Sequence, residues 1–409
     1  MKVWIKYLIG IALGIAAYFI LPTKVSSVGV VISGISEFAV RFGRYSLMPL
    51  LFFSASYAFF RLRDSRTLLK TSSWTILLVF AFTLILLVMG IMSALIVKIP
   101  RIPITGERMT ELPSVSIRSL LMQIFPYSGF DALKDGVYLL PAFVFAGFAG
   151  AGCASDKDSS KPVISLFESA SRLCYGISSF FVEWFSVGMI AVSCNWILSA
   201  RPYFESRTFV PLVILLTVDF VIFAVVVCPL VIRLVCKDPR PFRVLYASIC
   251  PLLASFFSGD SNISLQIAMR HGRESLGIRD ETNSFTFPFF SIFSRGGTSL
   301  VISICFVTIL GSYSGLDIKV EDVVWLFMSA FGLSFMLCSL PSGGTFVALT
   351  ILCMMYGRGF DAGYLLFRPV APVLCSFAAL FDVTSALYGS YITAVKTRTI
   401  DHNEIRHYI

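Results

Sequence analysis

The chain has 409 residues, of which 56% are hydrophobic and 14% are charged, whereas soluble domains average about 25% charged residues. A soluble fold of this length could not hide so much apolar surface from water, which excludes a soluble globular protein. The formal net charge is +9, but the basic residues collect in short segments between apolar runs. This distribution argues against a nucleic-acid-binding face and indicates loops that set the topology of a membrane protein.

Apolar runs long enough to cross a bilayer as a helix, about 20 residues, recur along the chain. Four such runs occupy residues 4–21, 38–60, 74–97 and 209–235. Longer runs broken by proline or glycine predict further membrane helices in residues 118–150, 166–198, 284–312 and 364–396. The first of these contains Pro126, Gly129, Gly136 and Pro141, so we expect it to bend or break. The sequence therefore predicts an all-α integral membrane protein.

Basic residues predict which side of the membrane each end of the chain occupies. They concentrate in two loops, at Arg61, Arg63, Arg66 and Lys70 and at Lys237, Arg240 and Arg243. The positive-inside rule places both loops in the cytoplasm. Counting crossings back from Arg61 places the amino terminus there, and the basic residues near the carboxyl terminus, Lys396, Arg398 and Arg406, fit the same side. We therefore expect a multi-pass protein of the cytoplasmic (inner) membrane with both termini in the cytoplasm. Since a long apolar run follows Lys2 and Lys6, we expect the first helix to be a retained anchor rather than a signal peptide.

Two further segments, residues 241–273 and 323–357, are apolar at both ends and polar in the middle. Their centres read Ser258-Gly259-Asp260-Ser261-Asn262 and Ser339-Leu340-Pro341-Ser342-Gly343-Gly344. Non-helical backbone at membrane depth is tolerated only where protein or a water-filled cavity surrounds it. Each segment is therefore predicted to be a re-entrant hairpin whose tip lines a shared polar cavity. The alternative is a single spanning helix with a kink at its glycine and serine residues.

Several landmarks follow the first hairpin in a characteristic order. They are Leu276-Gly277-Ile278, Ser284-Phe285-Thr286-Phe287-Pro288 and Ser294-Arg295-Gly296-Gly297-Thr298. The amino-terminal half adds Leu47-Met48-Pro49-Leu50-Leu51-Phe52, Ile124-Phe125-Pro126 and Leu139-Leu140-Pro141-Ala142-Phe143-Val144-Phe145. In order and spacing, over most of the chain, these landmarks resemble the dicarboxylate/amino acid:cation symporters, the glutamate transporter family.

The resemblance implies eight transmembrane helices plus two re-entrant helical hairpins, a homotrimer, and a transport domain that slides like an elevator against a scaffold. It implies that residues 1–115 form three helices shared between scaffold and transport domain. Residues 116–206 would form the broken fourth and the fifth helices, which serve as scaffold and trimer contact. Residues 207–409 would form the core of the transport domain. The implied function is secondary transport of a small polar or anionic organic solute, of the amino acid or dicarboxylate class.

The last helix departs from the family pattern. The family uses an Asp, an Arg, an Asn and a final Asp there to hold substrate and sodium. This chain places Ser376, Ala379, Val383 and Leu387 at those positions, with a register that could differ by one residue around Asp382. No arginine lies within residues 377–391 to bind a carboxylate with two parallel hydrogen bonds. Glutamate or aspartate is therefore not the expected substrate.

The unwound break of the seventh helix departs as well. The family supplies Asn and Asp oxygens to sodium there, whereas this chain has Ser294 and Gly296 with Arg295 between them. Because a buried guanidinium needs a partner, we expect Arg295 to pair with Asp382 or Asp260. We hypothesise that this fixed positive charge makes transport independent of sodium. Arg295 could instead contact an anionic substrate, or merely lock two helices together.

The candidate residues form two overlapping groups. The predicted substrate-binding residues are Ser258, Asp260, Ser261, Asn262, Arg295, Thr298, Pro341, Ser342, Gly343 and Asp382. The predicted cation site or its replacement consists of Ser294, Arg295, Gly296 and Asp382. No cofactor or metal is expected, because the cysteines form no Cys-x-x-Cys pair and only three histidines occur. Coupling to sodium or protons stays open, as do a passive uniporter and, less favoured, a membrane-embedded enzyme.

Overall fold

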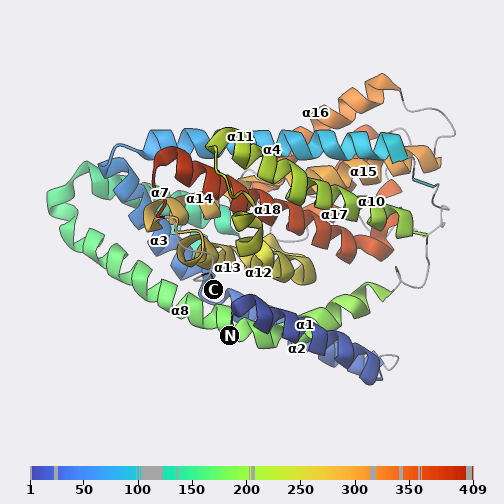
Figure 1. Cartoon of the computed structure of the whole chain (residues 1–409), viewed down its shortest axis with the longest axis horizontal. Helices are drawn as coiled ribbons and strands as arrows, with labels where there is room; N and C mark the ends of the chain where they lie inside the picture. Colours follow the sequence, from blue (N-terminus) through green and yellow to red (C-terminus); the bar gives the residue numbers. More distant parts are fainter. Residues whose placement is uncertain are drawn as a thin grey trace.

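The computed structural model describes residues 2–22, 26–97, 99–100, 102, 122, 124–134, 136, 138–201, 203, 208–313, 319–339, 344–357, 360, 362–401 and 408. Most of these residues are helical, and many of the helices run along the long axis of the molecule (Figure 1). The predicted all-α class is therefore confirmed. Of the site residues predicted from the sequence, Pro341, Ser342 and Gly343 lie outside the described residues.

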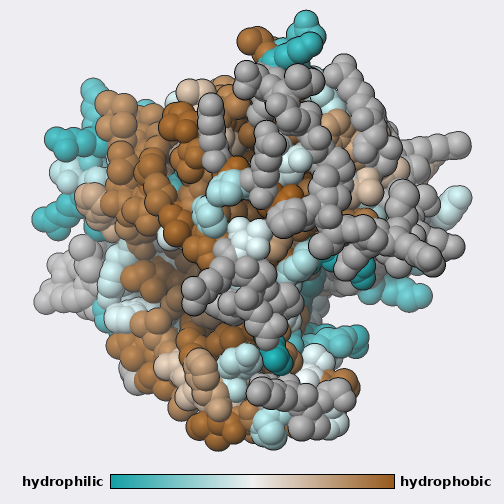
Figure 2. All heavy atoms as spheres, turned by 90° about the vertical axis from the view of Figure 1, so that its right-hand side faces the viewer, coloured by the Kyte–Doolittle hydropathy of each residue, from teal (hydrophilic) through white to brown (hydrophobic). Residues whose placement is uncertain are grey.

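Within the described part of the chain, six helical stretches are long and apolar enough to cross a membrane. They are Val3–Ile20 (α1), Leu68–Val97 (α4), Lys157–Ser199 (α8), Val210–Cys236, Asp280–Ser312 and Gly363–Thr397. Large hydrophobic side chains lie exposed along several of these helices, and hydrophobic residues gather on the left and at the bottom of the view in Figure 2. Such a surface is stable in lipid rather than in water.

The last three stretches are interrupted. Val210–Cys236 consists of α10 (Val210–Val221), a π-helical turn, η1 (Ile222–Val227), and α11 (Cys228–Cys236). Asp280–Ser312 is divided into α14 (Asp280–Phe293) and α15 (Gly296–Tyr313). Gly363–Thr397 begins with a 3-10 segment, η3 (Gly363–Val370), and continues as α18 (Ala371–Thr397). The break between α14 and α15 falls at Ser294 and Arg295, as predicted from the sequence.

The apolar run 38–60 was expected to be one helix, and this prediction is wrong. The structure instead has α2 (Ser26–Arg44) and α3 (Leu47–Asp64). Pro49 lies in the first turn of α3, where a missing N–H is harmless. Further into a continuous helix, the same ring would clash with the carbonyl four residues earlier and remove a hydrogen bond. The proline therefore favours a new helix start at this place.

The predicted break in residues 118–150 is present in the part that the structure describes. A short helix, α6 (Gly129–Lys134), precedes α7 (Leu139–Ser155). Asp156 then caps the start of α8 by accepting a hydrogen bond from the Ser159 N–H at 3.2 Å. Helices α1, α2 and α3 pack along α8, and α7 packs along α3.

Residues 241–273 form two helices that pack on each other, α12 (Phe242–Ser258) and α13 (Ser261–Glu274). Gly259 turns the chain between them with φ +63°, a value that glycine adopts without steric cost. Asp260 then caps α13 by accepting a hydrogen bond from the Asn262 N–H at 2.8 Å. One continuous kinked helix is therefore excluded for this segment. The second polar segment contains α16 (Val320–Met336), η2 (Leu337–Ser339) and α17 (Gly344–Tyr356).

Helix α18 lies at the centre of the molecule, packed against α4, α12, α13, α14, α15 and α17 (Figure 1). Its side chains are buried over nearly the whole length. Two glycines permit close packing: a β-carbon at Gly389 would lie 2.1 Å from Phe290, and one at Gly297 would lie 2.4 Å from the Ala378 carbonyl oxygen. These two contacts bring α14 and α15 close to one buried helix.

Candidate functional site

A small polar cavity lies where the starts of α13, α15 and α17 meet α18. Its free volume is about 20 Å³, which is room for a single water molecule. The lining combines one cation, one carboxylate, hydroxyl groups and small residues: Gly259, Ser261, Arg295, Thr298, Leu337, Gly344, Thr345, Cys375, Ala378, Ala379 and Asp382. The structure therefore brings Ser261, Arg295, Thr298 and Asp382 together, four of the residues selected from the sequence.

Arg295 occupies the gap between α14 and α15 and is 8% exposed. One terminal nitrogen, Nη1, donates a hydrogen bond to Ser261 Oγ at 2.8 Å. The Nε–H group is buried and has no hydrogen-bond partner. Leaving such a donor unpaired costs about 1–3 kcal/mol, so the guanidinium is held in the cavity with hydrogen-bonding capacity to spare.

Asp382 projects from α18 toward the start of α15 and is 5% exposed. Its Oδ1 accepts a hydrogen bond from the Gly297 N–H at 2.7 Å. This carboxylate therefore caps the amino-terminal end of α15, where free N–H groups and the helix dipole favour a negative charge. The contact requires glycine at 297, since a β-carbon there would lie 2.5 Å from Phe381 Cβ.

The cavity is electrostatically suited to an anion. Ser261 begins α13, Gly296 begins α15 and Gly344 begins α17, so the positive ends of these helices face the same small space. The guanidinium of Arg295 adds a full positive charge. Asp382 is the acidic residue in the lining, and it is already engaged by α15. Thr298 and Thr345 add hydroxyl groups whose Oγ1 atoms lie 3.5 Å apart.

Asp260 had been proposed as one of two partners for Arg295, but it is paired elsewhere. Its Oδ2 lies 3.1 Å from Nη1 of Arg44, and the two side chains are 4% and 15% exposed. No ion pair within 4.0 Å joins the described residues Arg295 and Asp382 either, although both line the cavity. Arg295 is instead held by the Ser261 hydroxyl.

Four other predicted site residues are described but do not line the cavity. Ser258 donates its hydroxyl to the Ala254 carbonyl at 2.6 Å, and Asn262 Oδ1 accepts from Ser291 at 3.2 Å. The Ser294 hydroxyl is buried without a partner. A β-carbon at Gly296 would lie 2.9 Å from Thr83 Cα, so this glycine faces α4. Among the described residues, no group of three or more His, Cys, Asp or Glu residues could hold a metal ion.

A larger cavity adjoins the first one and shares Gly259 and Cys375 with it. It has a volume of about 400 Å³ and lies between α2, α8, the end of α12 and the start of α18. Trp196 and Ser376 both line it, and Trp196 Nε1 donates a hydrogen bond to Ser376 Oγ at 2.8 Å. Ser376 occupies one of the four positions at which the family's last helix binds substrate and sodium. In this structure it lines the larger cavity and not the polar cavity.

Sequence reasoning missed Thr345, Cys375 and Ala378 as parts of the lining. A signal for Thr345 was available, because it directly follows the polar centre 339–344 of the second segment, and Ser261 lies in the polar centre of the first. Cys375 and Ala378 carry no comparable signal. Small residues on a central helix are ordinary packing residues unless the neighbouring helix ends are known.

Long apolar helices, polar breaks and an enclosed polar cavity define a multi-pass membrane protein built around an internal site. A profile of the sodium:dicarboxylate symporter family matches residues 1–396, and the chain therefore belongs to that family. A comparison with curated proteins gives no match. Family membership confirms the resemblance seen in the sequence and implies secondary transport of dicarboxylates or amino acids. The protein is a transporter and not an enzyme.

Proposed function

We propose that this transporter carries a small organic anion that binds in the polar cavity between α13, α15, α17 and α18. One observation supports the proposal above the others: a buried arginine with an unpaired Nε–H group shares the cavity with the starts of α13, α15 and α17. A carboxylate would satisfy that donor and would meet the positive ends of these helices. Ser261, Thr298 and Thr345 would supply hydroxyl groups to the same ligand.

The cavity must enlarge to admit such a solute. Its volume of about 20 Å³ is far below the roughly 300–1,000 Å³ typical of small-molecule sites. The adjoining cavity of about 400 Å³ supplies an approach along α18. We propose an elevator cycle in a homotrimer with eight transmembrane helices, in which α12–α13 and α16–α17 act as two re-entrant hairpins. Residues 207–409 would supply most of the moving part and residues 116–206 most of the scaffold, with residues 1–115 shared between them.

Transport independent of sodium is part of the proposal. The family places sodium ligands at the positions of Ser294 and Gly296, but this chain places the Arg295 guanidinium between them. A fixed positive charge in a buried space repels a second cation. The unpaired Nε–H group favours contact with a ligand over a purely structural lock, because a lock is expected to satisfy its buried donors.

Uptake into proteoliposomes tests the proposed function. Purified protein would be reconstituted, and accumulation of labelled dicarboxylates and amino acids would be measured in sodium and in choline buffer. We expect uptake to persist in choline and to be lost in Arg295→Met. The matched control is Arg368→Met, which removes an exposed arginine of η3 outside the cavity. Uptake that collapses without sodium and returns with it would contradict sodium independence.

A passive uniporter on the same scaffold is the second candidate, since the lost acidic ligands remove one means of coupling. Counterflow against a preset gradient distinguishes the two functions. A coupled carrier accumulates solute above equilibrium, whereas a uniporter only equalises concentrations. We propose a cytoplasmic (inner) membrane location with both termini in the cytoplasm, supported by the basic loops at 61–70 and 237–243.

A further inference from the structure

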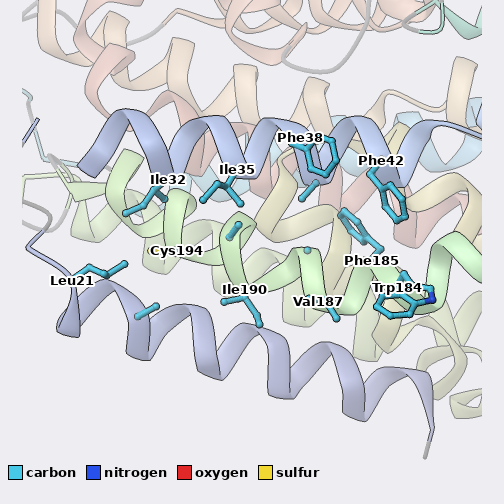
Figure 3. A pocket seen from close by; sticks show the side chains of 14 residues that line it. Leu21, Ile32, Ile35, Phe38, Phe42, Trp184, Phe185, Val187, Ile190 and Cys194 are labelled. Carbon is cyan, nitrogen blue, oxygen red and sulfur yellow. The ribbon is translucent and has the colours of Figure 1, made fainter. Parts of the chain in front are cut away.

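We infer that an anionic phospholipid places one acyl chain in an apolar groove between α1 and α2. The groove has a volume of about 490 Å³ and is lined by side chains of α1, α2 and α8. In Figure 3, α2 borders one side, α1 borders the other, and α8 runs between them. The groove lies away from the polar cavity and shares no lining residue with it.

The groove exists because α1 and α2 each pack along α8 but hardly touch each other. The bottom of the groove is lined by small residues, which leave its volume open: Ala39 on α2 and Gly188 and Ala191 on α8. The packing at the floor is already tight, since a β-carbon at Gly188 would lie 3.0 Å from Ala39 Cβ. Larger side chains stand beside this floor, among them Phe38, which is 69% exposed, and Trp184, which is 55% exposed.

A hydrocarbon chain is the occupant that this lining fits. Apart from the Trp184 indole and the Cys194 thiol, the lining side chains are aliphatic or phenyl groups. Two of the helices that line the groove, α1 and α8, are long and apolar enough to cross a membrane, so an acyl chain of the bilayer can reach the groove from its open side. In an empty groove the lining atoms would lack van der Waals partners on one side, and a flexible acyl chain would supply them.

Charge at one end of the groove selects the headgroup. The start of α1 and the end of α2 meet the same part of α8: Lys6 lies 3.2 Å from Glu183, and the Phe42 ring centroid lies 4.6 Å from that of Phe181. Arg41 lies at this end, with a side chain 78% exposed in a surface pair with Glu37.

A surface pair of this kind is weak, so the Arg41 guanidinium is available to a phosphate. Lys2 stands at the same end of α1 and donates to the Tyr246 hydroxyl at 3.2 Å rather than to a carboxylate. Anionic lipids of the cytoplasmic leaflet favour such basic positions next to a membrane helix. The headgroup would therefore lie near Lys2 and Arg41 while the chain follows the groove.

Native mass spectrometry of the detergent-purified protein provides the test. Ala191→Phe would fill the groove, and Gly176→Phe is the matched control on α8, where a β-carbon meets no atom within 4 Å. We expect a retained phospholipid adduct on the wild type and on Gly176→Phe, and at least a tenfold smaller occupancy on Ala191→Phe. Equal occupancy in all three proteins would overturn the inference. So would a change of oligomeric mass in Ala191→Phe without lipid loss, since a second copy would then cover the groove.

Fluorescence provides a second measurement that does not depend on the folding of Ala191→Phe. Phosphatidylglycerol with a dibrominated acyl chain would be titrated into delipidated wild-type protein and into Trp184→Phe. We expect saturable quenching in the wild type, most of it absent in Trp184→Phe, and weaker binding of phosphatidylcholine with the same chains. Quenching that rises linearly without saturation, that persists in Trp184→Phe, or that is the same for both headgroups would overturn the inference.

Discussion

Replacing Gly297 by alanine tests how closely the start of α15 approaches α18. A β-carbon at this position would lie 2.4 Å from the Ala378 carbonyl oxygen, 2.5 Å from Phe381 Cβ and 3.0 Å from Asp382 Oδ1. The first two atoms cannot rotate away, because the backbone of α18 fixes them. The start of α15 must therefore move, and the hydrogen bond from the Gly297 N–H to Asp382 must lengthen.

The expected loss of stability follows from two opposing effects. Alanine has a higher helix propensity than glycine, by about 0.8–1.0 kcal/mol in a helix interior, and this value is an upper limit for the second residue of α15. Overpacking a dense interior costs typically 1–3 kcal/mol, and the upper end applies where backbone has to shift. We therefore expect Gly297→Ala to lower the free energy of unfolding by roughly 1–2 kcal/mol.

Gly311→Ala is the matched control in the same helix, since a β-carbon there meets no atom within 4 Å. It should leave stability unchanged or raise it by up to about 1 kcal/mol. Thermal unfolding of both variants in one detergent, followed by tryptophan fluorescence, compares them directly. An unfolding temperature for Gly297→Ala at or above that of Gly311→Ala would refute the close approach of α15 to α18.

Two further predictions concern charged residues outside the cavity. Arg44→Met leaves Asp260 with a side chain that is 4% exposed and without its ion pair, so we expect destabilisation of about 3 kcal/mol. Arg41→Met removes the exposed ion pair with Glu37 and should change the free energy of unfolding by less than about 1 kcal/mol. Equal unfolding temperatures of Arg44→Met and Arg41→Met would contradict this reasoning. Burial alone would raise the pKa of Asp238, but hydrogen bonds from Tyr391 and from the Arg240 N–H, together with the Arg243 guanidinium, hold that pKa below its ordinary value. A carboxyl group whose pKa is lower in the folded state stabilises the fold above its unfolded-state pKa, near 3.9 for Asp, and this contribution is lost as pH falls through the folded-state pKa. Acidification from about pH 5 to pH 3 should therefore narrow the difference in unfolding temperature between wild type and Asp238→Asn. A constant difference would refute the lowered pKa of Asp238.

Local sequence signals predicted the parts of the fold that depend on neighbouring residues. Ser258 to Asn262 and Ser294 to Thr298 are polar or small stretches inside apolar runs, and both proved to be helix breaks. Membrane depth makes such stretches informative, because unpaired backbone is tolerated only around a cavity. The break between α2 and α3 was missed because residues 38–60 were read as one apolar run, although Arg41, Gly43 and Arg44 stand just before the break and Pro49 just after it.

Partners far apart in the sequence were beyond this kind of reasoning. Arg44 and Asp260 are separated by 216 residues, and nothing in either local sequence indicates the other. Asp382 was selected as a candidate partner for the buried Arg295, close to the positions at which the family's last helix binds substrate and sodium. Its role as the cap of α15 required the packing of Gly297 against α18 to be known. The groove between α1 and α2 exists because both helices pack on α8 with few contacts to each other. The hydrophobic pattern of a sequence does not show which helices are in contact.

The central claim is that Arg295 and the starts of α13, α15 and α17 form an anion site that needs no sodium. Thermal unfolding in sodium-free choline buffer, with succinate, malate, aspartate and other dicarboxylates or amino acids, tests it most directly. A ligand at 100 times its Kd stabilises the folded state by about 2.7 kcal/mol. We predict that at least one anion raises the unfolding temperature of the wild type and of Arg368→Met but not that of Arg295→Met. Stabilisation that appears only with sodium, or that is equal in Arg295→Met, would contradict the claim.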